Sequence, residues 1–130
     1  MSHATGALPL AGRVVRAAAR ALADKALKRV GLEHRARTLA ARVSGGERQL
    51  AALARALVGT PDLVLADEPT GSVDSETGAR ILALLEEWSA TTSGTLILVT
   101  HDPAVATRCR RLVKMRDGAV VDGAGSTLSA

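Results

Sequence analysis

The stretch LVLADE, residues 63–68, is a short run of apolar residues that ends in two adjacent carboxylates. Turn-forming residues bound it, with Pro61 before it and Pro69 after it. A continuous apolar run of this length is typical of a strand covered on both faces in a parallel sheet. Ligands of open α/β sheets bind beyond the carboxyl ends of the strands, which is where Asp67 and Glu68 lie. The stretch therefore predicts a buried strand with a candidate site at its end.

The chain after this strand has the pattern of a strand–helix–strand unit. A helix is predicted to begin near Asp74, and its apolar positions recur at helical spacing as far as Trp88. Residues 95–100, TLILVT, form a second apolar run that ends beside His101. This order predicts two buried parallel strands joined by a right-handed crossover. If they are neighbours in the sheet, His101 lies close to the carboxylate pair of the first strand.

Helices are predicted before the first strand and a hairpin after the second. Residues 13–30 contain strong helix formers throughout and end at Gly31, which suits a helix C-cap. The other expected elements are helices over residues 33–41, 44–59 and 103–109, a hairpin of residues 112–116 and 119–121 around Asp117-Gly118, and a loose tail from Gly123.

The sequence SGGE, residues 44–47, has the spacing of a capping box at the start of a helix. The free N–H groups and the dipole of a helix amino end attract anions, and two glycines let a phosphate approach the backbone closely. Helix capping alone also explains Ser44 and Glu47 without any ligand. The motif by itself therefore leaves both interpretations open.

Composition excludes several classes of protein. Of 130 residues, 47% are hydrophobic and 23% charged, which is typical of a globular chain. Cys109 is the only cysteine, so an internal disulfide and a multi-cysteine zinc site are excluded and a reducing compartment is favoured. Trp88 is the only aromatic residue of the Phe, Trp and Tyr type, which disfavours base stacking on nucleic acid. Basic residues gather in the first 60 positions, where helical spacing favours a solvated helix face.

Three segments taken together resemble the back half of an ATP-binding cassette (ABC) nucleotide-binding domain. They are VSGGERQ (residues 43–49), DEPTGSVD (67–74) and THD (100–102). In order and spacing they match the family's signature motif, its Walker B strand with the catalytic glutamate, its D-loop and its switch histidine. The resemblance runs from about Leu8 to Asp122. The motif sequences are most similar to those of the subgroup that serves lipoprotein-releasing, macrolide-exporter and cell-division-type permeases, although Ser72-Val73 replaces the usual Asn-Leu.

The resemblance implies an α/β fold, namely a partial P-loop NTPase (ABC ATPase) fold. A helical subdomain with the signature helix would occupy about residues 10–59. A part of the catalytic core, with parallel strands and a C-terminal β-hairpin, would occupy about residues 60–122, and residues 123–130 would form a tail.

The resemblance also implies a role for each motif residue. Glu68 would act as the general base, His101 would contact the γ-phosphate, and Asp67 would coordinate Mg²⁺. Asp74 would mark the D-loop that crosses the interface of a head-to-tail dimer. The signature residues would bind the γ-phosphate of an ATP held mainly by the opposite subunit; they are Ser44, Gly45 and Gly46.

The function implied is that of an ATP-hydrolysing subunit of an ABC transporter, with ATP and Mg²⁺ as cofactors. Its expected partners are a second nucleotide-binding domain and a membrane permease, which would hold it at the cytoplasmic face of the inner or plasma membrane. Direct binding to nucleic acid is not expected. Export or lipoprotein release would be driven by ATP binding and hydrolysis.

The Walker A motif of the family has no counterpart in the sequence. A phosphate loop needs Gly-Lys followed by Ser or Thr, and no Gly-Lys pair occurs. Gln49, the only glutamine, belongs to the signature motif, so the lid glutamine is missing as well. We therefore expect a truncated ABC ATPase, such as the product of a split or mis-started reading frame, that is inactive alone and exposes an apolar sheet edge.

Two alternatives stay open at this point. A non-catalytic pairing or regulatory subunit would donate its signature motif to an intact ATPase, and would show ATPase activity only in the mixture. A basic nucleic-acid-binding protein is the weaker alternative, because only the positive charge of the first 60 residues favours it.

Overall fold

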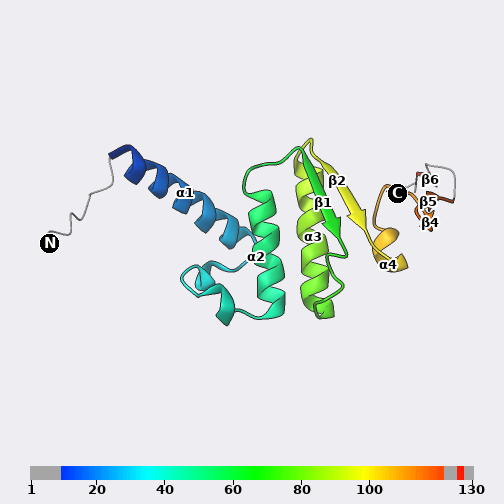
Figure 1. Cartoon of the computed structure of the whole chain (residues 1–130), viewed down its shortest axis with the longest axis horizontal. Coiled ribbons are helices and arrows are strands. Elements are labelled where there is room, and N and C mark those ends of the chain that lie inside the picture. The colour runs from blue at the N-terminus through cyan, green and yellow to red at the C-terminus, as the bar shows by residue number, and fades with distance from the viewer. Residues whose placement is uncertain (1–9, 122–125, 128–130) are drawn as a thin grey trace.

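The computed structural model describes residues 10–121 and 126–127 of the chain. Its helices are α1 (Leu10–Arg29), α2 (Gly45–Leu57), α3 (Ser75–Thr91) and the short α4 (Pro103–Ala106), with the 3-10 turns η1 (Glu33–Arg35) and η2 (Ala40–Arg42). Its strands are β1 (Leu63–Asp67), β2 (Thr95–Val99), β3 (Arg111–Leu112), β4 (Met115–Arg116), β5 (Ala119–Val120) and β6 (Ser126–Thr127). These elements follow one another along the long axis, from α1 at one end to the hairpin β4–β5 at the other (Figure 1).

Helix α1 ends at the glycine that the sequence indicates. Gly31 has a φ of 69°, a left-handed conformation that glycine adopts without strain. Its N–H donates to the Lys28 carbonyl at 2.9 Å, and the Leu32 N–H donates to the Leu27 carbonyl at 2.8 Å. This pair of bonds is a Schellman motif, so the predicted C-cap is confirmed.

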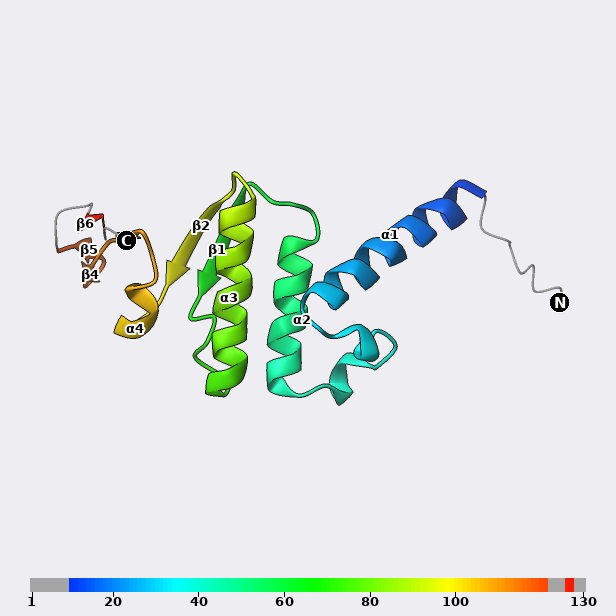
Figure 2. The same cartoon turned by 180° about the vertical axis from the view of Figure 1, so that it is seen from behind.

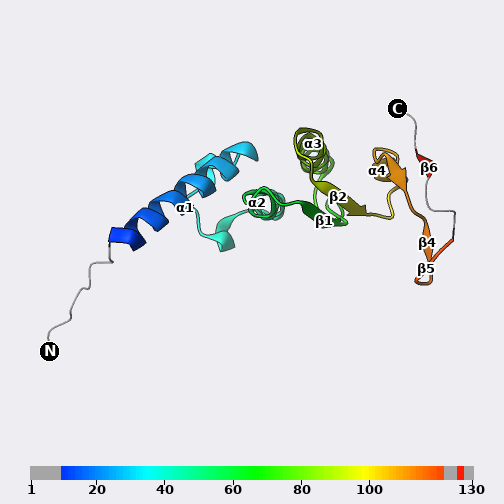
Figure 3. The ribbon, with the colours of Figure 1, turned by 90° about the horizontal axis from the view of Figure 1, so that it is seen from above.

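Strands β1 and β2 form a parallel pair, in register from Leu63 opposite Thr95 to Asp67 opposite Val99. The order β1, α3, β2 confirms the predicted strand–helix–strand unit. Helix α3 lies on one face of the pair, as seen from above in Figure 3. Figure 2 shows α2 running beside α3.

No described residue covers the other face of the β1–β2 pair. Four apolar side chains on this face have exposed fractions between 48% and 70%: Leu63, Leu65, Ile97 and Val99. The prediction of strands covered on both faces is therefore wrong for the described part of the chain, because α3 alone packs on this two-stranded sheet. An exposed apolar face of this kind is typical of a surface that another polypeptide segment covers.

The core is continuous from the end of α1 through α2 and α3 to β1. Trp88, Ile81, Leu85 and Val30 are its most deeply buried large side chains. All five apolar positions predicted for α3 are buried: Ile81, Leu82, Leu84, Leu85 and Trp88. The core is thus aliphatic around one indole ring, as the composition indicates. The division into subdomains near residue 59 stays a prediction.

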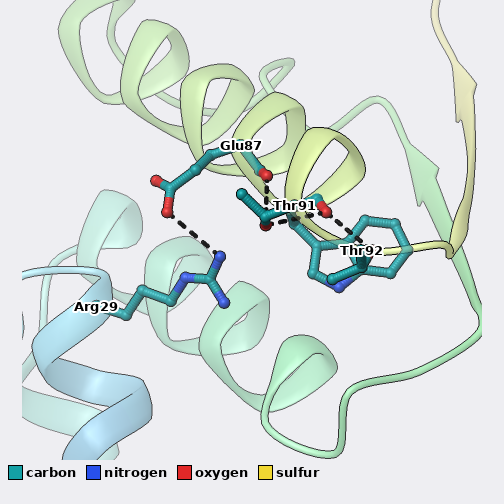
Figure 4. A network of polar contacts seen from close by, with 5 residues as sticks. Arg29, Glu87, Thr91 and Thr92 are labelled. Carbon is teal, nitrogen blue, oxygen red and sulfur yellow. Dashed lines mark hydrogen bonds and ion pairs between the residues drawn. The ribbon is translucent and has the colours of Figure 1, made fainter.

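A polar network joins α1 to the last turns of α3 (Figure 4). Arg29 Nη2 lies 3.4 Å from Glu87 Oε1, and the hydroxyl of Thr91 donates to the Glu87 carbonyl at 2.7 Å. The hydroxyl of Thr92 donates to the Trp88 carbonyl at 2.8 Å. The Trp88 carbonyl also accepts the Thr92 backbone N–H at 3.0 Å, so the Thr92 hydroxyl adds a second bond to it.

Two predicted helices differ from the structure. Residues 33–41 form only the turns η1 and η2, because none of the residues in those turns is buried and no apolar face holds a longer helix. Residues 103–109 form a helix only as far as Ala106, and the chain then turns. Within the described ranges, no helix combines the length and apolar character needed to cross a membrane.

The predicted hairpin is confirmed, with shorter strands. Asp117 and Gly118 have φ values of 50° and 77°, so both central residues of the turn are left-handed. They join β4 to β5, in which Met115 lies opposite Val120. Strand β6 pairs with β3 inside the segment predicted to be loose, so that prediction is wrong for residues 126–127. The rest of the tail lies outside the described residues.

Candidate functional site

Asp67 is the last residue of β1 and lies on the uncovered face of the strand pair. Alternation along β1 places its side chain on the same face as Leu63 and Leu65, and it is exposed. Among the described residues, no hydrogen bond or ion pair engages its carboxylate. Asp67 therefore presents an unengaged negative charge at the carboxyl end of the sheet.

Glu68 follows in a left-handed conformation that is rare for a residue with a side chain. Its φ is 44°, and its N–H still donates to the Val99 carbonyl at 2.8 Å, which extends the β1–β2 ladder by one bond. The backbone then leaves the sheet, and a turn closes from the Gly71 N–H to the Glu68 carbonyl at 3.1 Å. Strained conformations of this kind persist where the surrounding contacts hold them, and they cluster at functional sites.

The carboxylate of Glu68 contacts His101, as the parallel arrangement of the strands predicts. Glu68 Oε1 accepts the His101 backbone N–H at 2.8 Å and lies 2.6 Å from His101 Nδ1. Glu68 Oε2 accepts only the longer bond from the Thr100 hydroxyl, at 3.3 Å. The hydrogen bond from the His101 side chain is the main reason that the pKa of Glu68 lies below its ordinary value. Glu68 is therefore ionised at neutral pH, with Oε2 the less engaged oxygen.

The capping box predicted at the start of α2 is present. Ser44 Oγ accepts the Glu47 N–H at 3.1 Å, and Glu47 Oε2 accepts the Ser44 N–H at 2.8 Å. Capping uses one lone pair of the Ser44 hydroxyl and leaves its proton free to donate. Sequence reasoning missed Arg35, whose Nε donates to Glu47 Oε1 at 2.8 Å from the turn η1.

Asp74 caps the amino end of α3. Its Oδ1 accepts the Thr77 N–H at 2.9 Å and its Oδ2 accepts the Thr77 hydroxyl at 2.8 Å. The bond from the Thr77 backbone is the main cause that lowers the pKa of Asp74. The amino ends of α2 and α3 lie on the same side of the molecule (Figure 1). Ser44 and Asp74 therefore share one end of the fold.

Gln49 connects the two groups of site residues. Its side-chain amide donates to the Pro69 carbonyl at 3.5 Å, which ties α2 to the loop after Glu68. Sequence reasoning assigned Gln49 to the signature motif but gave it no contact. The contact joins residues 20 positions apart, so only the structure shows it.

A metal cage is not present in the described part of the chain, where no three His, Cys, Asp or Glu side chains gather. Mg²⁺ is commonly held by one or two carboxylates, with phosphate oxygens and water as its other ligands. Asp67 is a carboxylate of this kind, because no described residue donates a hydrogen bond to either of its oxygens. The residues present therefore fit Mg²⁺ bound together with a phosphate.

We expect acid to destabilise the fold partly through Glu47. The N–H of Ser44 and the guanidinium of Arg35 hold the pKa of Glu47 below its ordinary value of 4.5. The resulting stabilisation is complete above pH 4.5 and is lost as the pH falls through the lower folded-state pKa. Glu47→Gln keeps a capping side chain without the charge. Below pH 4.5 the melting temperature of this variant should therefore fall less steeply than that of the wild type.

Thermal denaturation followed by circular dichroism between neutral pH and strong acid measures this slope. Glu33→Gln is the control, because Glu33 is an exposed carboxylate for which the described residues provide no side-chain bond. Equal acid slopes for the wild type and Glu47→Gln would contradict the assignment.

Comparison with known proteins identifies the family. A model of the ABC transporter family matches residues 4–71, which is more than half of the chain. The chain therefore belongs to the family of ABC transporter ATP-binding proteins, as the motifs indicate.

Its relatives include three lipoprotein-releasing system ATP-binding proteins. LolD 1 of Caulobacter vibrioides is 48% identical over 101 residues, which cover 78% of this chain and 43% of the relative. LolD 2 of Rhodospirillum rubrum is 49% identical over 84% of this chain and 46% of the relative. LolD of Francisella tularensis is 46% identical over 75% and 42%. The chain thus spans less than half the length of these relatives, and the predicted subgroup is confirmed.

Solved structures give the same fold. The dimeric ATP-binding cassette MJ0796 in a post-hydrolysis state, bound to ADP and Pi, is 36% identical with a TM-score of 0.72. The match covers 97% of this chain and 51% of that one. An inward-facing ABC transporter described as of metal-chelate type is 28% identical with a TM-score of 0.73, over 80% of this chain and 42% of that one. The partial P-loop NTPase fold is therefore confirmed.

Proposed function

We propose that this chain provides the signature helix and the hydrolytic carboxylate of an ABC-type ATPase that drives a membrane permease of the lipoprotein-releasing kind. The observation that carries the proposal is the Glu68–His101 pair at the carboxyl end of two parallel strands, with Asp67 unengaged beside it. Its relatives named for lipoprotein release support the transport assignment.

Each side chain has a role that follows from its contacts. Glu68 Oε2, the less engaged oxygen, takes the proton from the attacking water. His101 donates to Oε1 from both its backbone and its ring, and these two bonds orient the carboxylate. Asp67 would hold Mg²⁺, which neutralises phosphate charge when bound. We assign Ser44 and Gly45 to the phosphate of a nucleotide bound by a second cassette.

The proposal places this chain beside a segment that supplies a phosphate loop. The sequence contains no Gly-Lys pair, and so no cradle of the Walker A type for ATP. The chain by itself should hydrolyse ATP at a negligible rate. A second cassette, a permease and a place at the cytoplasmic face of the membrane are the partners and location that we propose for the assembled protein.

A chimera tests the proposal. The 101 residues of this chain that align with LolD 1 of Caulobacter vibrioides replace their counterparts in that relative, which supplies the remainder. We expect the chimera to hydrolyse ATP at a rate within about tenfold of the intact relative, since fold and site residues are retained. The isolated chain is the matched negative control.

Two results would count against the proposal. A folded chimera that binds ATP and does not hydrolyse it would show that these residues are not a working catalytic half. If the chimera is inactive and the isolated chain raises the ATPase rate of the intact relative, the result would favour the pairing-subunit alternative.

A further inference from the structure

The two glycines of the signature segment, defined as Ser44, Gly45 and Gly46, have different surroundings. A Cβ added to Gly46 would lie 3.2 Å from Thr77 Cγ2 and 3.3 Å from Thr77 Oγ1, which is closer than ordinary contact. A Cβ added to Gly45 would meet only Arg48 Nη2, at 3.9 Å. The missing side chain of Gly46 therefore makes room for α3, and only Gly45 faces open space.

Thr77 also holds Asp74. Its backbone N–H and its hydroxyl donate to the two oxygens of the Asp74 carboxylate, at 2.9 Å and 2.8 Å. One side chain thus contacts Gly46 at the start of α2 and Asp74 at the start of α3. These two residues are 28 positions apart in the sequence, and Thr77 joins them in space.

We propose that Thr77 is a positioning residue that fixes the signature segment relative to Asp74. The inference rests on the proposed function, in which Ser44 and Gly45 face a second cassette, and on the role that the resemblance implies for Asp74 at the same interface. Its hydroxyl proton is directed to the Asp74 carboxylate, so Cγ2 and Oγ1 form the surface on which Gly46 packs. Movement of one segment would therefore displace the other.

A stability cycle on the isolated chain tests the contact. Gly46→Ala should melt about 4 °C below Gly45→Ala, because both variants gain the helix propensity of alanine and only the Cβ at residue 46 presses on Thr77. Thr77→Ser removes Cγ2 and should restore at least half of that loss in the double variant. Gly45→Ala is the matched control and should not lower the melting temperature. Equal melting temperatures for the two Gly→Ala variants would overturn the contact.

Amide chemical shifts test the positioning. Thr77→Val keeps the shape of the side chain and removes the hydroxyl, so we expect the ¹H–¹⁵N signals of Asp74 and of Gly45 and Gly46 to move together. Thr77→Ser, which keeps the hydroxyl, should leave the Asp74 signal near its wild-type position. Glu76→Gln controls for a change elsewhere in the first turn of α3. Signals of Gly45 and Gly46 that stay fixed in Thr77→Val would overturn the proposal.

The same variants in the chimera separate this inference from the proposed function. We expect Thr77→Val to lower kcat about fivefold to tenfold with little change in KM, and Thr77→Ser to restore it. An unchanged kcat in Thr77→Val would overturn the positioning role. An inactive unmodified chimera would instead overturn the proposed function, and the chemical-shift test would still decide the inference.

Discussion

Glu68→Gln is expected to lower ATP hydrolysis by the chimera about 10²- to 10⁴-fold, the usual contribution of a positioned general base. The amide keeps nearly the same shape, and its oxygen can still accept the His101 N–H. It lacks the second lone-pair-bearing oxygen that takes a proton from water. ATP binding should remain, because Glu68 does not contact the phosphate loop in this proposal.

Steady-state phosphate release and equilibrium nucleotide binding measure the two effects separately. Glu86→Gln is the control. Glu86 is an exposed carboxylate on α3, outside the site, and it pairs with Arg108 at 2.6 Å. Retention of more than about a tenth of wild-type hydrolysis in Glu68→Gln would show that another group accepts the proton.

Trp88→Ala should have the largest effect on stability, a loss of about 3–5 kcal/mol. The Trp88 side chain is 1% exposed and is the largest group in the core. Its ring also packs against Gly94, just before β2, where an added Cβ would lie 2.5 Å from the ring. Since small domains have a free energy of unfolding of about 5–15 kcal/mol, this loss would remove a large share of it.

Urea unfolding followed by far-UV circular dichroism measures the loss without relying on tryptophan fluorescence. Leu39→Ala is the control, because Leu39 is 67% exposed and its truncation should change stability by about 0.5 kcal/mol or less. Trp88→Phe should cost less than Trp88→Ala. The indole Nε1 has no hydrogen-bond partner among the described residues, so its removal offsets part of the lost packing. Equal effects of Trp88→Ala and Leu39→Ala would contradict the assignment.

The helices with strong local signals were predictable. The capping box at Ser44 and the left-handed glycine at Gly31 mark helix ends through bonds between residues close in sequence. The apolar positions of α3 recur at helical spacing, and all of them are buried. Residues 33–41 have helix-forming residues without such a face, so composition misled there.

The site was predictable in its membership and less so in its contacts. Parallel pairing of two apolar strands places His101 next to Glu68, and the sequence pattern indicates that pairing. The left-handed backbone at Glu68, the Arg35–Glu47 pair and the Gln49 contact depend on where separate elements meet. Local sequence carries little information about the Arg35–Glu47 and Gln49–Pro69 contacts, because they join residues 12 and 20 positions apart.

The motifs along the sequence by themselves determined the family, the order of the main elements and the residues of the candidate site, because these are encoded in short segments and their spacing. Only the tertiary structure decided that no described residue covers one face of the β1–β2 pair. It also showed that a Cβ at Gly46 would press on Thr77. Both features depend on which surfaces come together when the helices and strands pack, and no single segment contains that information.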